Sequence, residues 1–357
     1  MRRRIEITNL TALRFFAALL VFIDHFTMLP GPNRFEYVRD CGAVGVSVFF
    51  VLSGFILTYN YIDLDWQNRF RFSAKEFYIA RVGRIYPLHF LAALFALPLA
   101  LNSITARLIP AALPAHLALV NMFFPIKQLG APPNKVAWTL SCEVFFYLLT
   151  PMLFWFLNKF SISRRGFGVG VSFWILGEVI LFNAIPDWQP YFHNYGVFRF
   201  CDYLVGVWLC LLFTEKKGMR LGGGMVFLAI SLIAVAQMLP SAAATFVPIA
   251  ILWLPGAALI VLALACFDGG VNKVLARPLL LLLGNASFAL YLFHEAAFRY
   301  LKVLLDMKRI VLSGALMVLV FLITFLIFQF GAVWLHKRYE VPLQRWTKAR
   351  LGKIFLG

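Results

Sequence analysis

The sequence predicts an all-α, polytopic membrane protein with about ten transmembrane helices. Of its 357 residues, 62% are hydrophobic and only 14% are charged, compared with roughly 25% charged residues in a soluble domain. Apolar runs long enough to cross a bilayer recur along the chain, and short clusters of Lys and Arg separate them. A net charge of +17 would suggest a nucleic-acid partner for a soluble protein. Because these basic residues fall between apolar runs, we instead expect membrane lipids and no nucleic acid as partners.

The predicted spans are the apolar runs of about 17 to 25 residues. They lie at residues 10–30, 43–62, 86–104, 137–158, 169–186, 197–214, 221–239, 247–266, 279–298 and 310–332. A further apolar segment, 109–125, is short and bracketed by prolines, so we interpret it as an interfacial or re-entrant helix on the outer side. With the N-terminus inside, 22 of the 33 basic residues fall in inner segments and nine in outer segments, so both termini are expected to be cytoplasmic.

The segment after the last span is short and basic. We expect residues 1–336 to form one transmembrane domain and residues 337–357 to form a basic cytoplasmic tail on the inner leaflet. The five cysteines have no metal-ligand spacing, so the sequence indicates neither a zinc site nor a disulfide framework. We therefore expect no metal.

The first span keeps three ionisable residues, Arg14, Asp24 and His25, inside an apolar run. A charged residue at the centre of a span costs roughly 2.5–3.5 kcal/mol, so such residues usually face a protein interior or a wet cavity. Arg14 and His25 are eleven residues apart, close to three helical turns, which places both on one face about 16 Å apart. The alternatives are that Arg14 is a snorkelling anchor and that His25 only packs between helices.

Two further pairs of charged residues are spaced three apart. Arg81 and Arg84, in RVGRIYP, are neighbours on a helical turn at the inner side. They are either ordinary basic anchors or a phosphate clamp, because guanidinium groups match phosphate oxygens in two-point contacts. Arg199 and Asp202 are interpreted as a structural ion pair near the outer boundary.

Two later spans also carry ionisable residues. Glu143 lies in WTLSCEVFFYLLTP and His294 in SFALYLFH. Helix rise places His25, Glu143 and His294 at a similar depth, roughly 21–22 Å from the inner boundary, although depth alone does not establish contact. The alternatives are a helix–helix hydrogen bond for Glu143 and an interfacial position for His294. Ser141 and Tyr291, in the same two motifs, join His294 as candidates for the substrate side.

Taken in order along the chain, these motifs resemble the membrane-bound acyltransferase family 3. The resemblance is carried by Arg14 with His25, by FFVLSGFILT, by RVGRIYP, by WTLSCEVFFYLLTP and by SFALYLFH. These are bacterial enzymes that O-acetylate surface polysaccharides, lipopolysaccharide, peptidoglycan or Nod factors. The resemblance implies a multi-pass protein of the bacterial inner (plasma) membrane. It also implies acetyl-CoA as a cytoplasmic donor and a cell-surface or lipid-linked polysaccharide as the periplasmic acceptor.

By that resemblance, Arg14 and His25 are the family's essential pair, Arg81 and Arg84 its inner-loop arginines, and Glu143 its fourth-span carboxylate. Because CoA is polyanionic, we expect its phosphates to stay at the inner face, where these arginines bind them. Its thin thioester arm would then thread between spans toward His25.

In this hypothesis, His25 is oriented by Asp24 or Glu143, and it acts either as a general base or as a transient acyl acceptor. The sequence leaves both chemistries open. A rival from another class is a secondary transporter of an anionic solute, for which the internal pseudo-repeats typical of such carriers are not found. A third possibility is a scaffold of a glycan-assembly complex, in which His25 would be dispensable.

Overall fold

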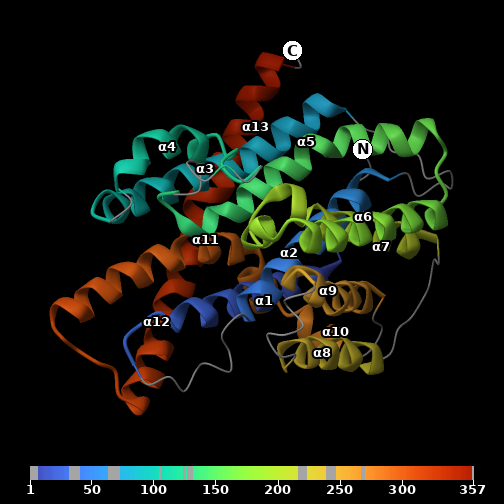
Figure 1. The fold of residues 1–357 in the computed structure, drawn as a ribbon. Helices are drawn as coiled ribbons and strands as arrows, with labels where there is room; N and C mark the ends of the chain where they lie inside the picture. Colours follow the sequence, from blue (N-terminus) through green and yellow to red (C-terminus); the bar gives the residue numbers. More distant parts are fainter. Residues whose placement is uncertain are drawn as a thin grey trace.

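The computed structural model describes residues 7–31, 41–62, 73–103, 106–123, 126, 132–215, 223–238, 247–266 and 270–355. Within these ranges the chain forms helices and no strand (Figure 1). The long helices are α1 (Thr8–Phe26), α2 (Cys41–Tyr61), α3 (Ala74–Leu101), α5 (Trp138–Lys159), α6 (Arg164–Ala184), α7 (Gly196–Glu215), α8 (Gly223–Met238), α9 (Ile249–Cys266), α11 (Pro278–Met307) and α12 (Gly314–Leu335). Shorter helices are α4 (Ile109–Leu117), α10 (Gly270–Leu275) and α13 (Val341–Phe355).

Every predicted span corresponds to one of the ten long helices. In the described part of the chain, nine helices are long and apolar enough to cross a membrane, and α8 is a shorter apolar helix. The all-α, multi-pass prediction is therefore confirmed. Residues 124 and 125, at the end of the predicted interfacial segment, and residues 356 and 357, at the end of the predicted tail, lie outside the described residues.

The third span begins earlier than predicted. The prediction started it at residue 86, whereas α3 begins at Ala74 and is capped by Ser73, whose hydroxyl accepts a hydrogen bond from the backbone N–H of Glu76 at 3.3 Å. Arg81 and Arg84 therefore lie on α3 itself rather than in a loop. The helix continues because its polar first turns pack against α13, so it does not need to end where the apolar run ends.

The segment predicted to be interfacial contains only the nine-residue helix α4. Its chain reverses at Leu119, whose φ of 57° is in the left-handed region. A helix of this length rises about 14 Å, too short to cross a bilayer core of about 30 Å, so it is not a span.

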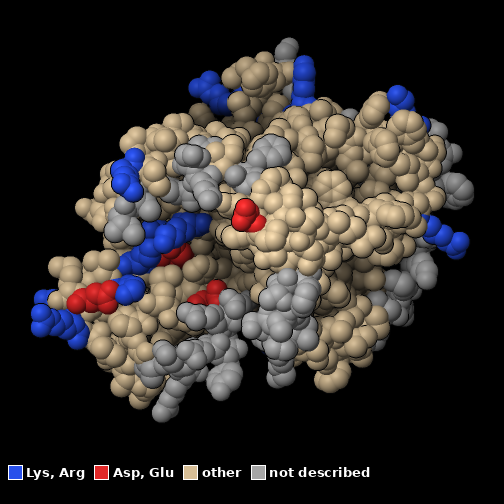
Figure 2. Space-filling model, viewed as in Figure 1, with Lys and Arg blue, Asp and Glu red and all other residues tan. Residues whose placement is uncertain are grey.

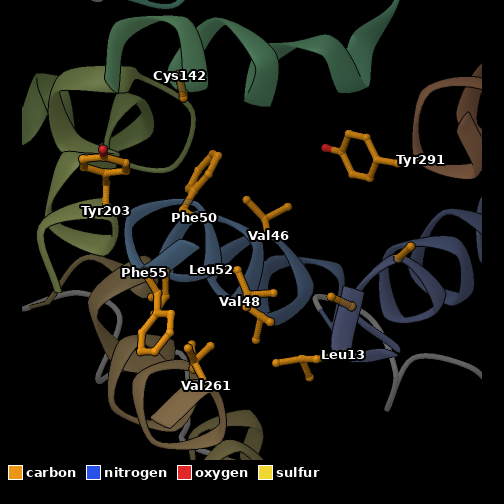
Figure 3. Packing of buried hydrophobic residues seen from close by; sticks show 14 of the residues in the cluster. Leu13, Val46, Val48, Phe50, Leu52, Phe55, Cys142, Tyr203, Val261 and Tyr291 are labelled. Carbon is orange, nitrogen blue, oxygen red and sulfur yellow. The ribbon is translucent and has the colours of Figure 1, made fainter. Parts of the chain in front are cut away.

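The most buried helices are α2 and α7, which form the centre of the bundle. In their apolar windows 78% of the residues are buried, compared with 28% in α6 and 22% in the segment that begins with α12. The close approach of α2 and α7 depends on glycine, because a Cβ on Gly54 or Gly206 would overlap the facing backbone of Tyr203 or Val51. Side chains of α2 pack tightly around this contact (Figure 3).

The outer helices expose large apolar side chains. Most of the face seen in Figure 2 is formed by residues other than Lys, Arg, Asp and Glu. Phe173 on α6, Phe227 on α8 and Phe330 on α12 are among the exposed apolar side chains. Such surfaces are unusual in soluble proteins and fit contact with lipid.

The predicted tail is helical. A π-helical turn, His336–Glu340, joins α12 to α13, and α13 packs along α3. The C-terminal segment thus belongs to the same packed structure as the spans, and it contacts the part of α3 that carries Arg81 and Arg84. Contact of the tail with the inner leaflet stays a prediction.

Candidate functional site

A cavity lies between α1, α2, α3, α5 and α11, with about 930 Å³ of space not filled by atoms, which includes space open to solvent. Apolar and polar residues line it in similar numbers, and Tyr291 projects into the interior toward Val46 and Phe50 of α2 (Figure 3). The polar residues that line it are Arg14, Ser53, Asn60, Arg81, Arg84, Thr139, Glu143, Tyr147, Ser287 and Tyr291. A chamber in which polar groups converge beside apolar side chains is suited to a small molecule that has both polar and apolar parts.

Three arginines from two helices converge on one carboxylate in this cavity. The positive charges of Arg84, Arg81 and Arg14 all act on Glu143. The Tyr147 hydroxyl, one turn further along α5, donates to the Glu143 carboxylate at 3.1 Å. Three cations around one carboxylate leave an excess of positive charge, which is suited to a polyanion.

The Arg81 guanidinium packs on aromatic rings and forms no direct ion pair with an acid in the part of the chain that the structure describes. It lies over the rings of Tyr147, at 5.7 Å, and Phe77, at 5.8 Å. Its Nε atom is buried and has no hydrogen-bond partner among the described residues. A buried guanidinium N–H without an acceptor is costly, and a bound anion would satisfy it.

The cavity has a second polar group at the start of α5. Thr139 Oγ1 donates to the Tyr291 hydroxyl at 2.9 Å, and the Tyr291 hydroxyl donates to the Val136 carbonyl at 3.2 Å. Thr139 and Tyr147 are eight residues apart on α5, which corresponds to about 12 Å along the helix. The cavity therefore extends from the arginine cluster to this pair of hydroxyls.

Beyond Tyr291 lies a pair of histidines. Nε2 of His294 is 3.2 Å from Nδ1 of His25, and their ring centroids are 4.9 Å apart. The pair is packed against Phe22, whose ring centroid is 6.1 Å from that of His294. Neither histidine lines the cavity, but the backbone carbonyl of Tyr291 is 2.8 Å from Nδ1 of His294. Tyr291 thus connects the cavity to the histidine pair.

The hydrogen bonds assign the proton positions of this pair. Nδ1 of His294 faces the carbonyls of Tyr291, at 2.8 Å, and Leu290, at 3.1 Å, so it carries the proton because carbonyls only accept. Nε2 of neutral His294 is then an acceptor, 3.2 Å from His25 Nδ1, which is also 3.0 Å from the Val21 carbonyl, so His25 Nδ1 carries a proton and donates it to these acceptors as a hydrogen bond. Neutral His25 therefore keeps a free electron pair on Nε2.

The structure thus changes one part of the sequence hypothesis. We expected Asp24 or Glu143 to orient His25, but the side-chain partner of its Nδ1 is His294. Glu143 instead lies with the arginines, and Asp24 packs against Gly42 on α2. The predicted common depth of His25 and His294 matches their direct contact.

Five of the other candidate residues line the cavity, and one is buried outside it. Arg14, Arg81, Arg84, Glu143 and Tyr291 all line the same cavity. Ser141 does not line it; its buried hydroxyl accepts a hydrogen bond from the backbone N–H of Met122 at 2.9 Å.

Sequence reasoning missed five polar residues that line the cavity: Ser53, Asn60, Thr139, Tyr147 and Ser287. Three of them lie four residues from a predicted candidate, since Tyr147 and Thr139 flank Glu143, and Ser287 precedes Tyr291. This spacing, which places residues on one helix face, was the signal that could have found these three.

The predicted ion pair on α7 is confirmed. Arg199 and Asp202 are both fully buried, with Nη2 and Oδ1 at 3.1 Å, and Arg199 also donates to the Ser47 hydroxyl at 2.9 Å. Burial, and secondarily the charge of Arg199, lower the pKa of nearby His193 to about 4, so His193 is neutral at pH 7. This cluster joins α7 to α2 and does not line the cavity.

The fold and the cavity define a multi-pass membrane protein with a positively charged chamber beside a buried histidine pair. The chain belongs to the acyltransferase family: the family described as "Acyltransferase domain" matches residues 7–329. This match confirms the family indicated by the five motifs, and it favours acyl transfer over transport.

Individual relatives agree with the family. The chain is similar to Acyltransferase MdmB of Streptomyces mycarofaciens, with 29% identity covering 84% of this chain and 80% of the relative. It is similar to Exopolysaccharide production protein ExoZ of Rhizobium meliloti, with 28% identity covering 72% of this chain and 76% of the relative. It is also similar to Peptidoglycan O-acetyltransferase OatA of Listeria monocytogenes, with 25% identity covering 59% of this chain and 35% of the relative. No solved structure matches the chain.

Proposed function

We propose that the protein moves an acyl group, most simply acetyl, from acyl-CoA to a hydroxyl of a cell-surface or lipid-linked polysaccharide. The observation that carries the proposal is one cavity that joins three arginines to Tyr291, which holds the histidine pair. The names of two relatives, an exopolysaccharide production protein and a peptidoglycan O-acetyltransferase, support a glycan as the acceptor.

The donor fits the cavity by charge and by shape. Phosphate groups of CoA bind Arg81, Arg84 and Arg14, where the positive charge exceeds that of the single carboxylate. The pantetheine arm occupies the apolar part of the chamber and brings the thioester toward Thr139 and Tyr291. Their hydroxyl groups provide polar contacts at this end of the cavity.

The chemistry needs one base beside the thioester. His25 Nε2 accepts the proton of the acceptor hydroxyl, whose oxygen attacks the thioester carbonyl. A C–O bond forms, the C–S bond breaks, and the CoA thiolate takes the proton back from the His25 imidazolium. In the relay version, the Nε2 electron pair attacks the thioester carbonyl, the C–S bond breaks and CoA leaves as the thiolate. The sugar oxygen then takes the acyl group from Nε2, the N–C bond breaks, and the hydroxyl proton passes to the CoA thiolate. Both versions need the electron pair on Nε2, which the hydrogen bond to His294 supports.

The proposed orientation places the donor on the cytoplasmic side of the bacterial inner membrane and the acceptor on the periplasmic side. The distribution of basic residues supports this orientation, because Arg14, Arg81 and Arg84 lie toward the end of the bundle predicted to be inside.

The test is acyl transfer by purified protein in nanodiscs, where both faces are accessible. Protein is given radiolabelled acetyl-CoA and an oligosaccharide acceptor, and label on the sugar is measured for wild type, His25→Ala and His336→Gln. We expect His25→Ala to lose activity by about a hundredfold or more, because it removes the base. His336→Gln is the matched control, since His336 lies outside the cavity and pairs with Glu340.

Unchanged transfer by His25→Ala would overturn the proposal and favour a scaffold. Uptake of anionic solute into liposomes without label on sugar would favour the transporter. A labelled protein adduct that forms in a single turnover and is lost in His25→Ala would select the relay.

A further inference from the structure

The C-terminal helix α13 contacts α3 at the residue between the two arginines. A Cβ on Gly83 would lie 3.3 Å from Cγ of Lys348 and 3.4 Å from the carbonyl oxygen of Gln344. One turn further along α3, the Tyr339 hydroxyl is 3.5 Å from the Pro87 carbonyl, to which it donates. Gly83 thus lets the Lys348 stem lie directly on α3, between Arg81 and Arg84.

This contact brings like charges together. The charges of Arg81 and Arg84 both act on the Lys348 ammonium. Within the described residues, α13 contains four basic residues and no acidic one: Arg345, Lys348, Arg350 and Lys353. Such a cluster repels itself unless an anion is bound, and repulsion of this kind opposes the packing of α13 on α3.

The carboxylate beside the arginines does not remove the excess charge. Glu143 interacts with Arg14, Arg81 and Arg84 and accepts a hydrogen bond from Tyr147. Lys348, on which the charges of Arg81 and Arg84 act, adds a fourth cation to this group, so the single carboxylate leaves an excess of three positive charges. The excess matches a ligand that carries several negative charges, such as one with more than one phosphate group.

We propose that Lys348 completes the phosphate-binding site of the donor by adding a third cation from α13 to Arg81 and Arg84. The inference rests on the proposed function, and it concerns residues beyond 7–329, the region that the family matches. Lys348 is exposed, so its ammonium is accessible to a ligand that enters from the aqueous side. A lysine acts as a point charge on phosphate, so an arginine at this position retains most of its contribution.

Phosphate is shared by CoA and by anionic lipid headgroups. Because the Lys348 stem lies at Gly83, between the two arginines that line the cavity, the geometry favours the soluble donor over lipid. The test therefore uses nanodiscs of zwitterionic lipid, to which CoA or anionic lipid is added separately.

The first measurement is the dissociation constant of CoA for wild type, Lys348→Gln, Lys348→Arg and Lys353→Gln. We expect Lys348→Gln to bind CoA about five- to tenfold more weakly, and Lys348→Arg to stay within about twofold of wild type. Lys353→Gln is the matched control, an exposed lysine on the same helix, and is expected to bind as wild type does. Equal affinity of wild type and Lys348→Gln would overturn the inference. Absence of CoA binding by wild type would instead overturn the proposed donor. The two results differ because the first requires that wild type binds CoA.

The second measurement uses only wild-type protein, so it does not depend on how a variant folds. Lysines are acylated with an amine-reactive reagent, and modification at Lys348 and Lys353 is quantified by peptide mass spectrometry. CoA is expected to protect Lys348 by about threefold or more and to leave Lys353 unchanged. Equal modification with and without CoA would overturn the inference. Protection by anionic lipid alone would reassign the site to a headgroup and overturn the role in donor binding.

Discussion

At the scale of single residues, the tautomer of His25 is the feature on which the chemistry depends. His294 Nε2 accepts a hydrogen bond from Nδ1–H of His25, and the Tyr291 and Leu290 carbonyls fix His294 in turn. In catalytic triads a carboxylate does this work by holding the imidazole in the tautomer that exposes the reactive nitrogen. Here a neutral imidazole occupies that position, so no buried charge is needed beside the base.

His294 is therefore expected to act as a positioning residue. His294→Ala should lower kcat by about tenfold and leave CoA affinity unchanged, because one of the two acceptors near His25 Nδ1–H is lost far from the arginines and only the Val21 carbonyl remains. His294→Gln should recover part of the activity, since a side-chain carbonyl can accept the same hydrogen bond. The check is kcat and the CoA dissociation constant measured separately. If kcat and CoA affinity both decreased, and His294→Gln recovered neither, His294 would have only a packing role.

Arg14 is expected to act on donor binding. Arg14→Ala should raise the KM for acetyl-CoA by about tenfold with a small change in kcat, because one of three cations around the phosphates is removed. Steady-state rates over a range of acetyl-CoA concentrations measure this. Arg107→Ala is the control, since Arg107 lies in the short helical turn before α4 and does not line the cavity. A normal KM in Arg14→Ala would remove Arg14 from the donor site.

The sequence predicted the residues of the site better than their partners. Helical periodicity placed Arg14 and His25 on one face, and α1 is one uninterrupted helix, so that prediction needs no tertiary information. The contact of His25 with His294 depends on which helices are neighbours, and depth along a span carries no information about that. For the same reason the sequence offered Asp24 or Glu143 as the group that orients His25, although Glu143 interacts with the arginines of α3.

At the scale of helices, hydropathy predicted the existence of the elements and missed where α3 begins. The inner part of α3 is charged, so it reads as a loop when only apolar runs are counted. It is helical because Ser73 caps it and α13 covers it. The extension matters for the site, since it holds Arg81 and Arg84 three residues apart on a rigid helix face.

The contact of α2 with α7 gives a test at this scale. A Cβ at Gly206 would overlap the Val51 carbonyl, so Gly206→Ala should push the two central helices apart and destabilise the protein by about 1–3 kcal/mol. Thermal unfolding of detergent-solubilised protein measures the change. Gly170→Ala on α6 is the matched control, because no atom lies within 4 Å of the position of its Cβ. Equal melting temperatures for the two variants would contradict this packing.

At the scale of the whole molecule, the arrangement separates the helices that form the site from those that face lipid. The cavity is built by α1, α2, α3, α5 and α11, whereas α6 and α12 expose much of their apolar surface. Composition predicts such a protein, because a chain that is 62% hydrophobic cannot bury all its apolar surface internally. It cannot predict which helices are peripheral, since the mean hydropathy of the central helices, 2.1 for α2 and 1.7 for α7, lies between the 1.6 of α6 and the 2.6 of the segment that begins with α12.

The orientation of the whole molecule in the membrane gives the last prediction. If the arginine end of the cavity faces the cytoplasm, the C-terminus after α13 lies on the same side, because α13 packs on the arginine-bearing part of α3. A C-terminal green fluorescent protein should then fluoresce, and a C-terminal alkaline phosphatase should be inactive. The same phosphatase inserted in the turn between α11 and α12, next to Arg309, should be active. This turn lies at the start of α12, whereas α13 follows the other end of α12, so the turn and α13 are expected on opposite sides of the membrane. Reversed activities would place the arginines outside, where cytoplasmic acyl-CoA cannot reach them, and the donor would have to be sought on the other face of the membrane.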